Sequence, residues 1–311
     1  MIINPGYRVF EFAQETWDRH YIEYRERWND VPKTGKTLNM PLNLDVETTN
    51  ACNLRCPFCV REYMKDNIGK MTNETFDKII EEVEMIKLPA MKMNWRGEPT
   101  LHEQLPKMIR KAKHAGVVEV SINTNGTMFT PTLIANLIDS GLDRIIISID
   151  SINSDVYRTQ RVGAELEDTI AGLKKLLELR KISSGEYGRP YIRVQKIDLP
   201  ETRQEDFVTY FKNLGVDTVA INTYKEKDET GIDWEPLPCC QPFQRMGVTW
   251  DGNFFPCCQG HMFPSIGNVK DMSIVGAWHS PMMYQLREFH HTGKQGLIPQ
   301  CRKCETTRPE K

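Results

Sequence analysis

Three cysteines with the spacing CxxxCxxC, Cys52, Cys56 and Cys59, directly follow the first strand-like run of the chain. A tetrahedral structural zinc site uses four protein ligands, and iron–sulfur clusters are normally held by four cysteines. The next cysteine is Cys239, and the histidines on either side are His20 and His102. A [4Fe–4S] cluster bound here would therefore keep one iron open for a ligand that is not protein. On spacing alone, a zinc knuckle is the alternative.

A second group of cysteines lies near the C-terminal end of the sequence. Its six members are Cys239, Cys240, Cys257, Cys258, Cys301 and Cys304. In a reducing compartment such residues are more plausible as metal ligands than as disulfides. The segment over 231–311 is too short for a large core of its own, so we expect its fold to depend on metal. Residues 248–256 predict a hairpin with Asp251-Gly252 at the turn.

The elements that must position the first cysteine group alternate between strand and helix patterns. The predicted strands cover residues 42–49, 90–96, 117–123, 143–150, 190–197 and 217–223. Six βα units predict an α/β fold, a parallel sheet curled into a (β/α)6 partial barrel of the TIM type. The loops after the strands then meet at the carboxyl edge of the sheet, and the cysteine loop is one of them.

The helices between these strands have recognisable ends. Thr130-Pro131 predicts the start of one helix, and Gly116, Gly141 and Gly215 each predict the end of another. Before the first strand, the spacing of Trp17, Tyr21, Tyr24 and Trp28 predicts an amphipathic helix over 8–30, followed by a loop over 29–36.

Three parts are therefore expected along the chain. They are an N-terminal helical extension over 1–40, the partial barrel over 41–230 and a cysteine-rich domain over 231–311, reached through a polar linker at 225–231.

Composition gives no sign of a nucleic-acid or membrane partner. The 311 residues carry a formal charge of −2 without basic runs, so an electrostatic footprint for nucleic acid is missing. No apolar stretch approaches the roughly 20 residues that a membrane span needs. The first residues lack a signal-peptide pattern, so we expect a cytoplasmic protein.

With these motifs the chain resembles the radical S-adenosylmethionine (SAM) superfamily. The CxxxCxxC signature of that family has an aromatic residue before its last cysteine, here Phe58, and its open iron binds the amino and carboxylate groups of SAM. The family's GGEP motif is represented by Gly97, Glu98 and Pro99, with Arg96 in place of the first glycine. The resemblance implies that this motif contacts the methionyl amino group.

Four further residues match places that the family uses for SAM. Ser148 and Asp150 follow the fourth predicted strand, where the resemblance implies contact with the ribose. Asn123 ends the third strand, and Arg161 resembles an arginine that meets the SAM carboxylate. For Asn123 a simple turn is an equal alternative, and for Arg161 a solvent-exposed helix edge is nearly as good.

The C-terminal segment resembles the SPASM and twitch extensions of radical SAM enzymes, which carry auxiliary iron–sulfur clusters. The resemblance implies one auxiliary [4Fe–4S] cluster. Its ligands would be Cys239, Cys257, Cys301 and Cys304. Cys240 and Cys258 would then be spare, and the choice between Cys239 and Cys240 is open. For this segment taken alone, a zinc ribbon is the alternative.

The chemistry implied by the resemblance is cleavage of SAM to a 5′-deoxyadenosyl radical that abstracts hydrogen from a substrate. The favoured outcome is dehydrogenation, the net oxidation of an alcohol in a small polar molecule, sugar-like or cyclitol-like, with the auxiliary cluster as electron acceptor. An external one-electron reductant such as flavodoxin or ferredoxin would supply the first electron. The alternatives are an epimerase that uses Cys258 or Cys240 as hydrogen donor, a ribosomal-peptide maturase, and a non-enzymatic zinc or iron–sulfur binding protein.

Overall fold

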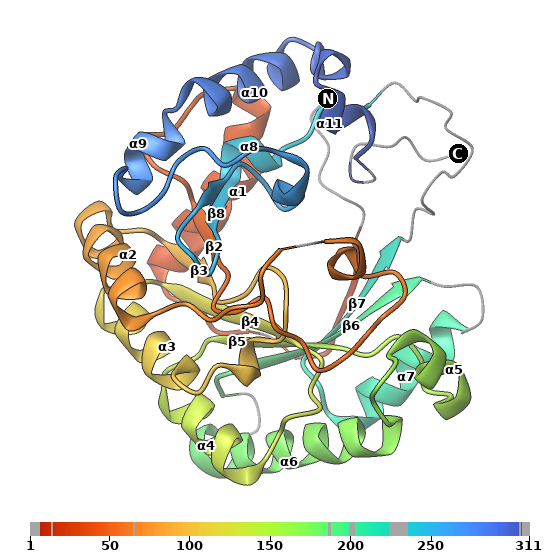
Figure 1. Ribbon diagram of the computed structural model, residues 1–311. Coiled ribbons are helices and arrows are strands. Elements are labelled where there is room, and N and C mark those ends of the chain that lie inside the picture. The colour runs from red at the N-terminus through yellow and green to blue at the C-terminus, as the bar shows by residue number, and fades with distance from the viewer. Residues whose placement is uncertain are drawn as a thin grey trace.

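The computed structural model describes residues 7–13, 15–64, 66–185, 188–198, 203–223, 236–304 and 306. A nine-stranded sheet runs through them in the order β1-β7-β6-β5-β4-β3-β2-β8-β9 (Figure 1). The strands are β1 (Tyr7–Glu11), β2 (Asn43–Val46), β3 (Ala90–Lys92), β4 (Glu119–Thr124), β5 (Arg144–Ser148), β6 (Tyr191–Asp198), β7 (Thr218–Thr223), β8 (Arg245–Val248) and β9 (Phe254–Phe255).

Strands β2 to β7 form the parallel part of the sheet. Each of them pairs in parallel with the next strand along the chain. These six strands overlap the six predicted ranges, and the predicted α/β fold with a parallel sheet is confirmed. The side chains on one face of the sheet are apolar and fully buried, because every second residue of a strand points to the same side. They include Leu44, Met91, Ile122, Ile145, Ile147, Val194 and Val219.

Helices cover this apolar face. Figure 1 shows them in an arc around the outside of the strands. They are α2 (Asn73–Ile86), α3 (Leu105–His114), α4 (Pro131–Asp139), α5 (Ser154–Gln160), α6 (Leu166–Ser184) and α7 (Gln204–Leu214). Two short 3-10 helices lie along the chain between β2 and α2 and between β3 and α3, η1 (Val60–Tyr63) and η2 (Pro99–Leu101). The predicted ends are confirmed: the Thr130 side chain accepts from the Leu133 amide at the start of α4, and Gly215 closes α7 with φ 94°.

The prediction for the N-terminal segment is wrong in two places. Residues 8–11 belong to strand β1 rather than to a helix, because β1 pairs antiparallel with β7 and so covers the edge of the parallel strands. Helix α1 (Arg19–Thr34) begins after Asp18, whose side chain accepts from the Tyr21 amide, and it continues through most of the predicted loop to Gly35.

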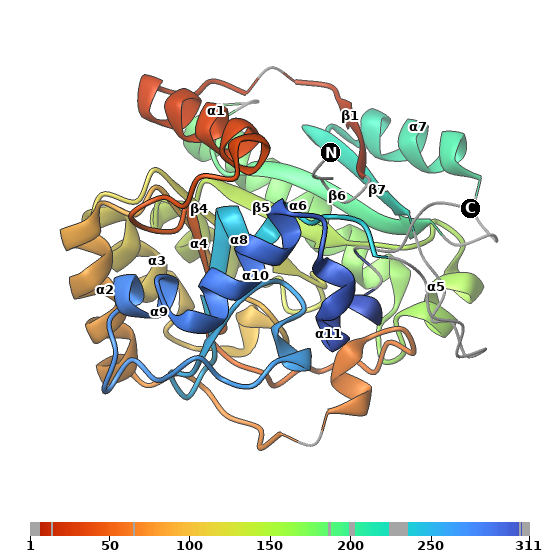
Figure 2. The same ribbon diagram turned by 90° about the horizontal axis from the view of Figure 1, so that it is seen from above.

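Pro32 does not end α1, and the reason is a contact with a distant part of the chain. A proline has no backbone N–H, so the carbonyl of Trp28, four residues earlier, loses its helical partner. The Gln244 side chain replaces it, since its Nε2 donates to that carbonyl at 2.7 Å. Figure 2 shows α1 on the upper side of the sheet in that view, and α1 contacts α8 (Gln241–Gln244).

The C-terminal segment extends the sheet. Strand β8 pairs in parallel with β2, and β9 returns antiparallel to β8 through the predicted hairpin, with Gly252 at φ 90° in the turn. The remaining short elements are η3 (Gly260–Met262), α9 (Ile274–Trp278), α10 (Pro281–His291), η4 (Gln295–Leu297) and α11 (Pro299–Arg302). The predicted linker at 225–231 lies outside the described residues.

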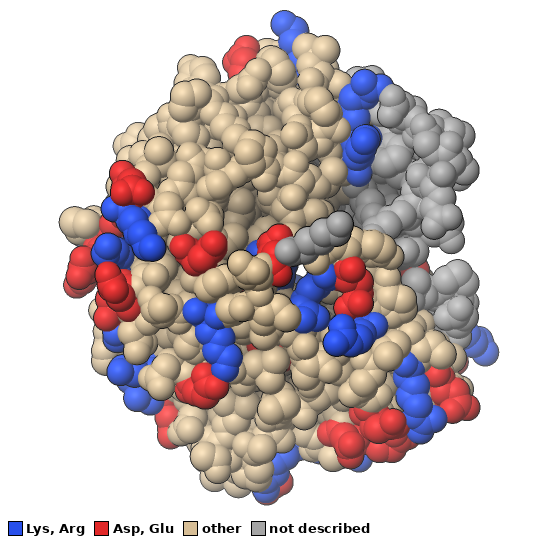
Figure 3. All heavy atoms as spheres, in the orientation of Figure 1, with Lys and Arg blue, Asp and Glu red and all other residues tan. Residues whose placement is uncertain are grey.

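Charged side chains of both signs are interspersed over the face shown in Figure 3, and they are sparse in its upper part, where the C-terminal helices lie. Within the described ranges, we find no helix with the length and apolar character required of a membrane span.

Candidate functional site

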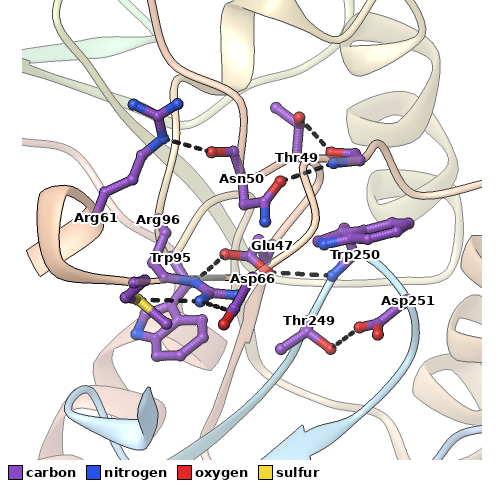
Figure 4. Close-up of polar contacts among 12 residues, drawn as sticks. Glu47, Thr49, Asn50, Arg61, Asp66, Trp95, Arg96, Thr249, Trp250 and Asp251 are labelled. Atoms are coloured by element: carbon purple, nitrogen blue, oxygen red, sulfur yellow. Dashed lines mark hydrogen bonds and ion pairs between the residues drawn. The ribbon is translucent and has the colours of Figure 1, made fainter. Parts of the chain in front are cut away.

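The cysteine loop, residues 52–59, leaves the carboxyl end of β2 and is held by three neighbouring segments. Glu98 N donates to Ala51 O at 2.7 Å, and Arg55 N donates to Val162 O at 2.9 Å. Arg61 Nε donates to Asn50 O at 2.8 Å (Figure 4). The loop is therefore held by hydrogen bonds to the segments around it, two of them between backbone groups.

The three cysteines of this loop differ in exposure. Cys56 is buried, whereas Cys52 and Cys59 are partly exposed. Burial raises the pKa of the Cys56 thiol to about 11 and also raises that of Cys52. Burial thus favours the neutral thiols of Cys52 and Cys56 in the absence of a metal, and a bound cation would stabilise their thiolates.

Gly97 lets the loop after β3 approach the cysteine loop closely. Its φ is 70°, and a side chain there would collide with the carbonyl oxygens of Thr49 and Ala51. Only glycine fits this place without a shift of the backbone. Pro99, at the start of η2, is buried as well.

Glu98 lies inside the protein, with 2% of its surface exposed. Its carboxylate accepts from Thr100 Oγ1 and Thr124 Oγ1, each at 2.6 Å, and from the Asn125 amide at 2.7 Å. Burial raises the pKa of Glu98, and these hydrogen bonds oppose that shift. The carboxylate thus joins the loop after β3 to the loop after β4.

Arg161 brings together three residues that the sequence singled out. Its Nε is 2.6 Å from Asp150 Oδ2, its Nη1 lies 3.9 Å from Cys56 Sγ, and its guanidinium carbon is 5.4 Å from the centre of the Phe58 ring. The other oxygen of Asp150 accepts from the Ile197 amide at 2.9 Å. The carboxylate predicted to bind ribose is therefore engaged with protein donors.

Asn123 and Ser148 lie on neighbouring strands near the same edge of the sheet. The backbone N–H of Asn123 donates to Asn94 Oδ1 at 2.7 Å. The side-chain Oδ1 of Asn123 is buried without a hydrogen-bond partner among the described residues. Ser148, at the end of β5, is partly exposed.

Arg96 is the centre of an ion-pair network that the sequence did not reveal (Figure 4). Its Nε and Nη2 bind the two oxygens of Glu47 at 2.6 and 2.9 Å, and its Nη1 binds Asp66. Glu47 also accepts from the Trp250 amide at 3.3 Å, so the network ties β2 and the segment after the cysteines to the β8–β9 hairpin. Two features of the sequence could have indicated this network. They are a carboxylate, Glu47, in a predicted strand and Arg96 in place of the first glycine of the family motif.

Five cysteines converge on one pocket of the C-terminal segment, the C-terminal cysteine pocket. They are Cys239, Cys257, Cys258, Cys301 and Cys304. Its other described lining residues include the apolar Phe263 and Leu286. Cys240 is buried beside the pocket, and its side chain is hydrogen-bonded to that of Cys239.

His290, which the sequence did not single out, orients two of these cysteines. Its Nδ1 accepts from the Cys239 amide at 3.1 Å, so its Nε2 carries the proton and can donate to Cys301 Sγ, 3.5 Å away. Burial lowers the pKa of His290 to about 4, which keeps the imidazole neutral. A donor aimed at a ligand sulfur is typical of the second layer around metal sites.

The donor sets of both cysteine groups suit iron–sulfur clusters. Thiolates are the ligands that such clusters prefer, and apolar walls with one hydrogen-bond donor to sulfur are characteristic of their sites. Among the described residues no three His, Cys, Asp or Glu side chains meet at a point where a single metal ion would bind.

Trp95 lies between the ion-pair network of Arg96 and the C-terminal cysteine pocket. Its Nε1 donates to Cys258 O at 2.8 Å, and its ring stacks on Phe255 with centroids 3.9 Å apart. The Arg96 guanidinium lies over the same ring at 4.3 Å. The network beside the cysteine loop is thereby in contact with the wall of the C-terminal cysteine pocket.

Comparison with known proteins places two family domains on these two sites. Residues 46–197 match the radical SAM superfamily, and residues 239–305 match SPASM, an iron–sulfur cluster-binding domain. A tungsten-containing aldehyde ferredoxin oxidoreductase cofactor-modifying protein of Pyrococcus furiosus is 27% identical over 84% of this chain and 86% of its own length. A probable GTP 3′,8-cyclase of Pyrococcus horikoshii is 34% identical, over 44% of this chain and 43% of its own.

Solved structures with the same fold have low sequence identity. BtrN in complex with AdoMet and 2-DOIA superimposes with a TM-score of 0.58 and 17% identity, over 85% of this chain and 93% of that one. Streptococcus suis SuiB bound to the precursor peptide SuiA gives a TM-score of 0.60 and 13% identity, over 88% and 73% of the two chains.

Proposed function

This chain belongs to the radical SAM superfamily and carries a SPASM iron–sulfur domain, and from that premise we propose that it oxidises an alcohol carbon of a small polar substrate. In this proposal Cys52, Cys56 and Cys59 hold the cluster that binds SAM. Four cysteines of the C-terminal pocket hold the auxiliary cluster: Cys239, Cys257, Cys301 and Cys304. When bound, these groups supply a 5′-deoxyadenosyl radical and an acceptor for the second electron of the oxidation.

The observation that carries the proposal is a short chain of contacts between the surroundings of the two cysteine groups. Arg96, which belongs to the ion-pair network beside the cysteine loop, lies over Trp95, and Trp95 donates to the wall of the C-terminal cysteine pocket. Oxidation needs an electron acceptor within reach of the place where hydrogen is removed, and these contacts support such an arrangement. The small polar substrate is supported by the names of the two sequence relatives, which refer to a cofactor and to a nucleotide.

The chain's own residues would orient SAM and exclude water. Gly97 opens the backbone approach to the cysteine loop, and Glu98 fixes the loops after β3 and β4 against each other. Arg161, held by Asp150 beside Cys56, presents a cation toward the expected place of the SAM carboxylate. Pro99, Asn123, Ser148 and Phe58 complete the proposed contacts. An external one-electron reductant, such as flavodoxin or ferredoxin, is part of the proposal.

Epimerisation is the second candidate, and the position of Cys258 favours it over a peptide reaction. Cys258 lines the C-terminal cysteine pocket without belonging to the proposed ligand set, and its carbonyl accepts from Trp95. A thiol placed there is a candidate hydrogen donor to a substrate radical. Cys240, beside Cys239, is the other candidate.

Product mass and solvent deuterium separate the two reactions. We expect reconstituted, reduced protein to yield a product two mass units lighter than the substrate, without solvent label, because oxidation removes two hydrogens. Cys304→Ala should abolish that product, whereas Cys258→Ala should retain it. A product of unchanged formula that carries one solvent deuterium and is lost in Cys258→Ala would instead establish epimerisation, because a thiol exchanges its hydrogen with water.

A further inference from the structure

The face of the parallel sheet that points away from the helices is lined by polar side chains. We call it the polar sheet face, and its members are Asp45, Lys92, Ser121, Asn123, Ser148, Gln195, Asn222 and Arg245. They share one side because neighbours in register on parallel strands face the same way, as in Asp45 beside Lys92, Lys92 beside Ser121 and Ser148 beside Gln195. The opposite face consists of the apolar core residues under the helices.

Several polar groups on this face lack a partner within the described part of the chain. Asn123 Oδ1 and Asn222 Oδ1 are buried and accept no hydrogen bond from it. The Lys92 side chain is partly exposed, and within the ranges that the structure describes its amine makes no hydrogen bond or ion pair. Buried polar groups are nearly always satisfied in folded proteins, so the two asparagine oxygens on this face call for donors that the described residues do not supply.

The Lys92 amine lies beside a carboxylate that another cation already binds. The groups that face it are Asp45 on β2, Arg245 on β8 and the thiol of Cys258. Asp45 is already paired, because Arg245 Nη1 lies 3.2 Å from its Oδ2 and Asn43 Nδ2 donates to its Oδ1 at 3.0 Å. The carboxylate beside Lys92 is thus already engaged by Arg245 and Asn43, and among the described residues the Lys92 amine has no ion pair of its own.

Holding the Lys92 ammonium charged in this place has an electrostatic cost. Burial lowers the pKa of Lys92, Arg245 lowers it further, and Asp45 only partly opposes them. An anion at the amine would remove that cost, since a charge-assisted hydrogen bond is strongest in a poorly hydrated place.

We propose that Lys92 binds an anionic oxygen group of the substrate, a carboxylate or a phosphate, at the floor of the polar sheet face. The inference rests on the proposed function, because it concerns the substrate of the same site. Lys92 belongs to strand β3 itself, whereas Gly97 and Glu98 lie in the loop beyond it, and its neighbour Arg245 comes from the C-terminal segment. The anionic group would therefore lie deeper in the sheet than SAM. Asn222 offers an oxygen for a hydroxyl group of the same molecule.

Anion titration of the reconstituted holoenzyme tests this assignment. Inorganic phosphate and acetate are titrated separately by calorimetry into the wild type, Lys92→Met, Lys92→Arg and Lys78→Met, the last being an exposed lysine on α2 as the matched control. Lys92→Met should weaken binding by about tenfold or more, because a bond to a charged group is lost. Lys92→Arg and Lys78→Met should bind as the wild type does. Preference for phosphate or for acetate identifies the kind of group.

A second variant, with the opposite expected effect on anion affinity, keeps the proposal testable if Lys92→Met misfolds. Asp45→Asn removes the carboxylate that opposes the anion, so it should bind phosphate more tightly than the wild type. Unchanged affinity in Lys92→Met, or equal weakening in Lys78→Met, would overturn the assignment. Formation of 5′-deoxyadenosine by the wild type and Lys78→Met is recorded in parallel. If anion binding depends on Lys92 but no 5′-deoxyadenosine forms, the proposed function fails and the anion site stands.

Discussion

At the scale of single residues, the polar contacts around the cysteine loop are more interdependent than their spacing suggests. Arg96, Glu98 and Arg161 each use a charged group to hold two or more loops together. Such buried charges stabilise the site only while their partners are present, because a lone buried charge has a large desolvation cost. Substitutions at these positions should therefore act on stability and on SAM binding together.

Replacing Arg96 with the glycine that the family motif carries should destabilise this protein. Glu47 has a side chain that is 0% exposed, and without Arg96 it would be left as an unpaired buried carboxylate. We expect Arg96→Gly to lower the free energy of unfolding by about 3–5 kcal/mol. Denaturant unfolding measures this change.

Two comparisons separate the loss of the Arg96–Glu47 ion pair from the added backbone freedom of a glycine. Arg96→Met should cost nearly as much, and adding Glu47→Gln to either variant should restore part of the loss. Lys70→Ala, which removes an exposed ion pair with Glu103, should change stability by less than about 1 kcal/mol. A neutral effect of Arg96→Gly would show that Glu47 finds another partner.

Glu98→Ala should weaken SAM binding. Its carboxylate positions the loops after β3 and β4, and three of its protein donors would lose their acceptor. Loss of bonds to a charged group predicts an affinity for SAM lower by about tenfold or more. Equilibrium dialysis of the reconstituted protein measures it, with exposed Glu103→Ala as the control. Equal SAM affinities of Glu98→Ala and Glu103→Ala would show that Glu98 does not contribute to SAM binding.

At the scale of elements, several segments take their final form from partners far away in the sequence. Helix α1 passes through Pro32 because Gln244 satisfies the carbonyl that the proline leaves open. Strand β8 pairs with β2 although about 200 residues separate them along the chain. The Asp45–Arg245 ion pair joins the same two strands. The C-terminal segment is thereby anchored to both the N-terminal helix and the sheet.

A double-mutant cycle on Pro32 and Gln244 tests this anchoring. Gln244→Ala should lower the free energy of unfolding by about 1–3 kcal/mol, because the buried Trp28 carbonyl would lose its donor. In a Pro32→Ala background the restored backbone N–H can bond to that carbonyl, so the cost of Gln244→Ala should fall to near zero. Additive effects of the two substitutions would show that the Gln244 side chain does not act through the Trp28 carbonyl.

At the scale of the whole molecule, the two cysteine groups lie in separate segments attached to one continuous sheet. The cysteine loop follows β2, and the C-terminal cysteine pocket is formed by residues that precede β8 and by residues that follow β9. Each group should therefore assemble its cluster without the other.

Iron content after anaerobic reconstitution checks this independence. With two [4Fe–4S] clusters the wild type should hold about eight irons per chain, and changing Cys52, Cys56 and Cys59 together to alanine should leave about four. Changing Cys301 and Cys304 instead should also leave about four. Zinc in stoichiometric amounts without iron-dependent absorbance would contradict the cofactor assignment at both places.

Local patterns in the sequence were enough to predict the strands of the parallel sheet and the ends of several helices. Alternation of apolar residues depends on the immediate neighbours of a residue, as do a Thr-Pro start or a glycine stop, so these predictions are confirmed in the structure. The spacing of Cys52, Cys56 and Cys59, with the second cysteine group, likewise predicted the two family domains.

Only the tertiary structure decided which charges and polar atoms face one another. The helix predicted over 8–30 became a strand and a later helix because the β7 edge was available for pairing. Asp150 and Glu98 were expected to meet SAM, yet their oxygens hold Arg161, Thr124 and backbone amides. The carboxylate beside Lys92, that of Asp45, is already paired with Arg245. Such contacts join residues far apart in the chain, and their energies depend on burial, which local sequence patterns do not encode.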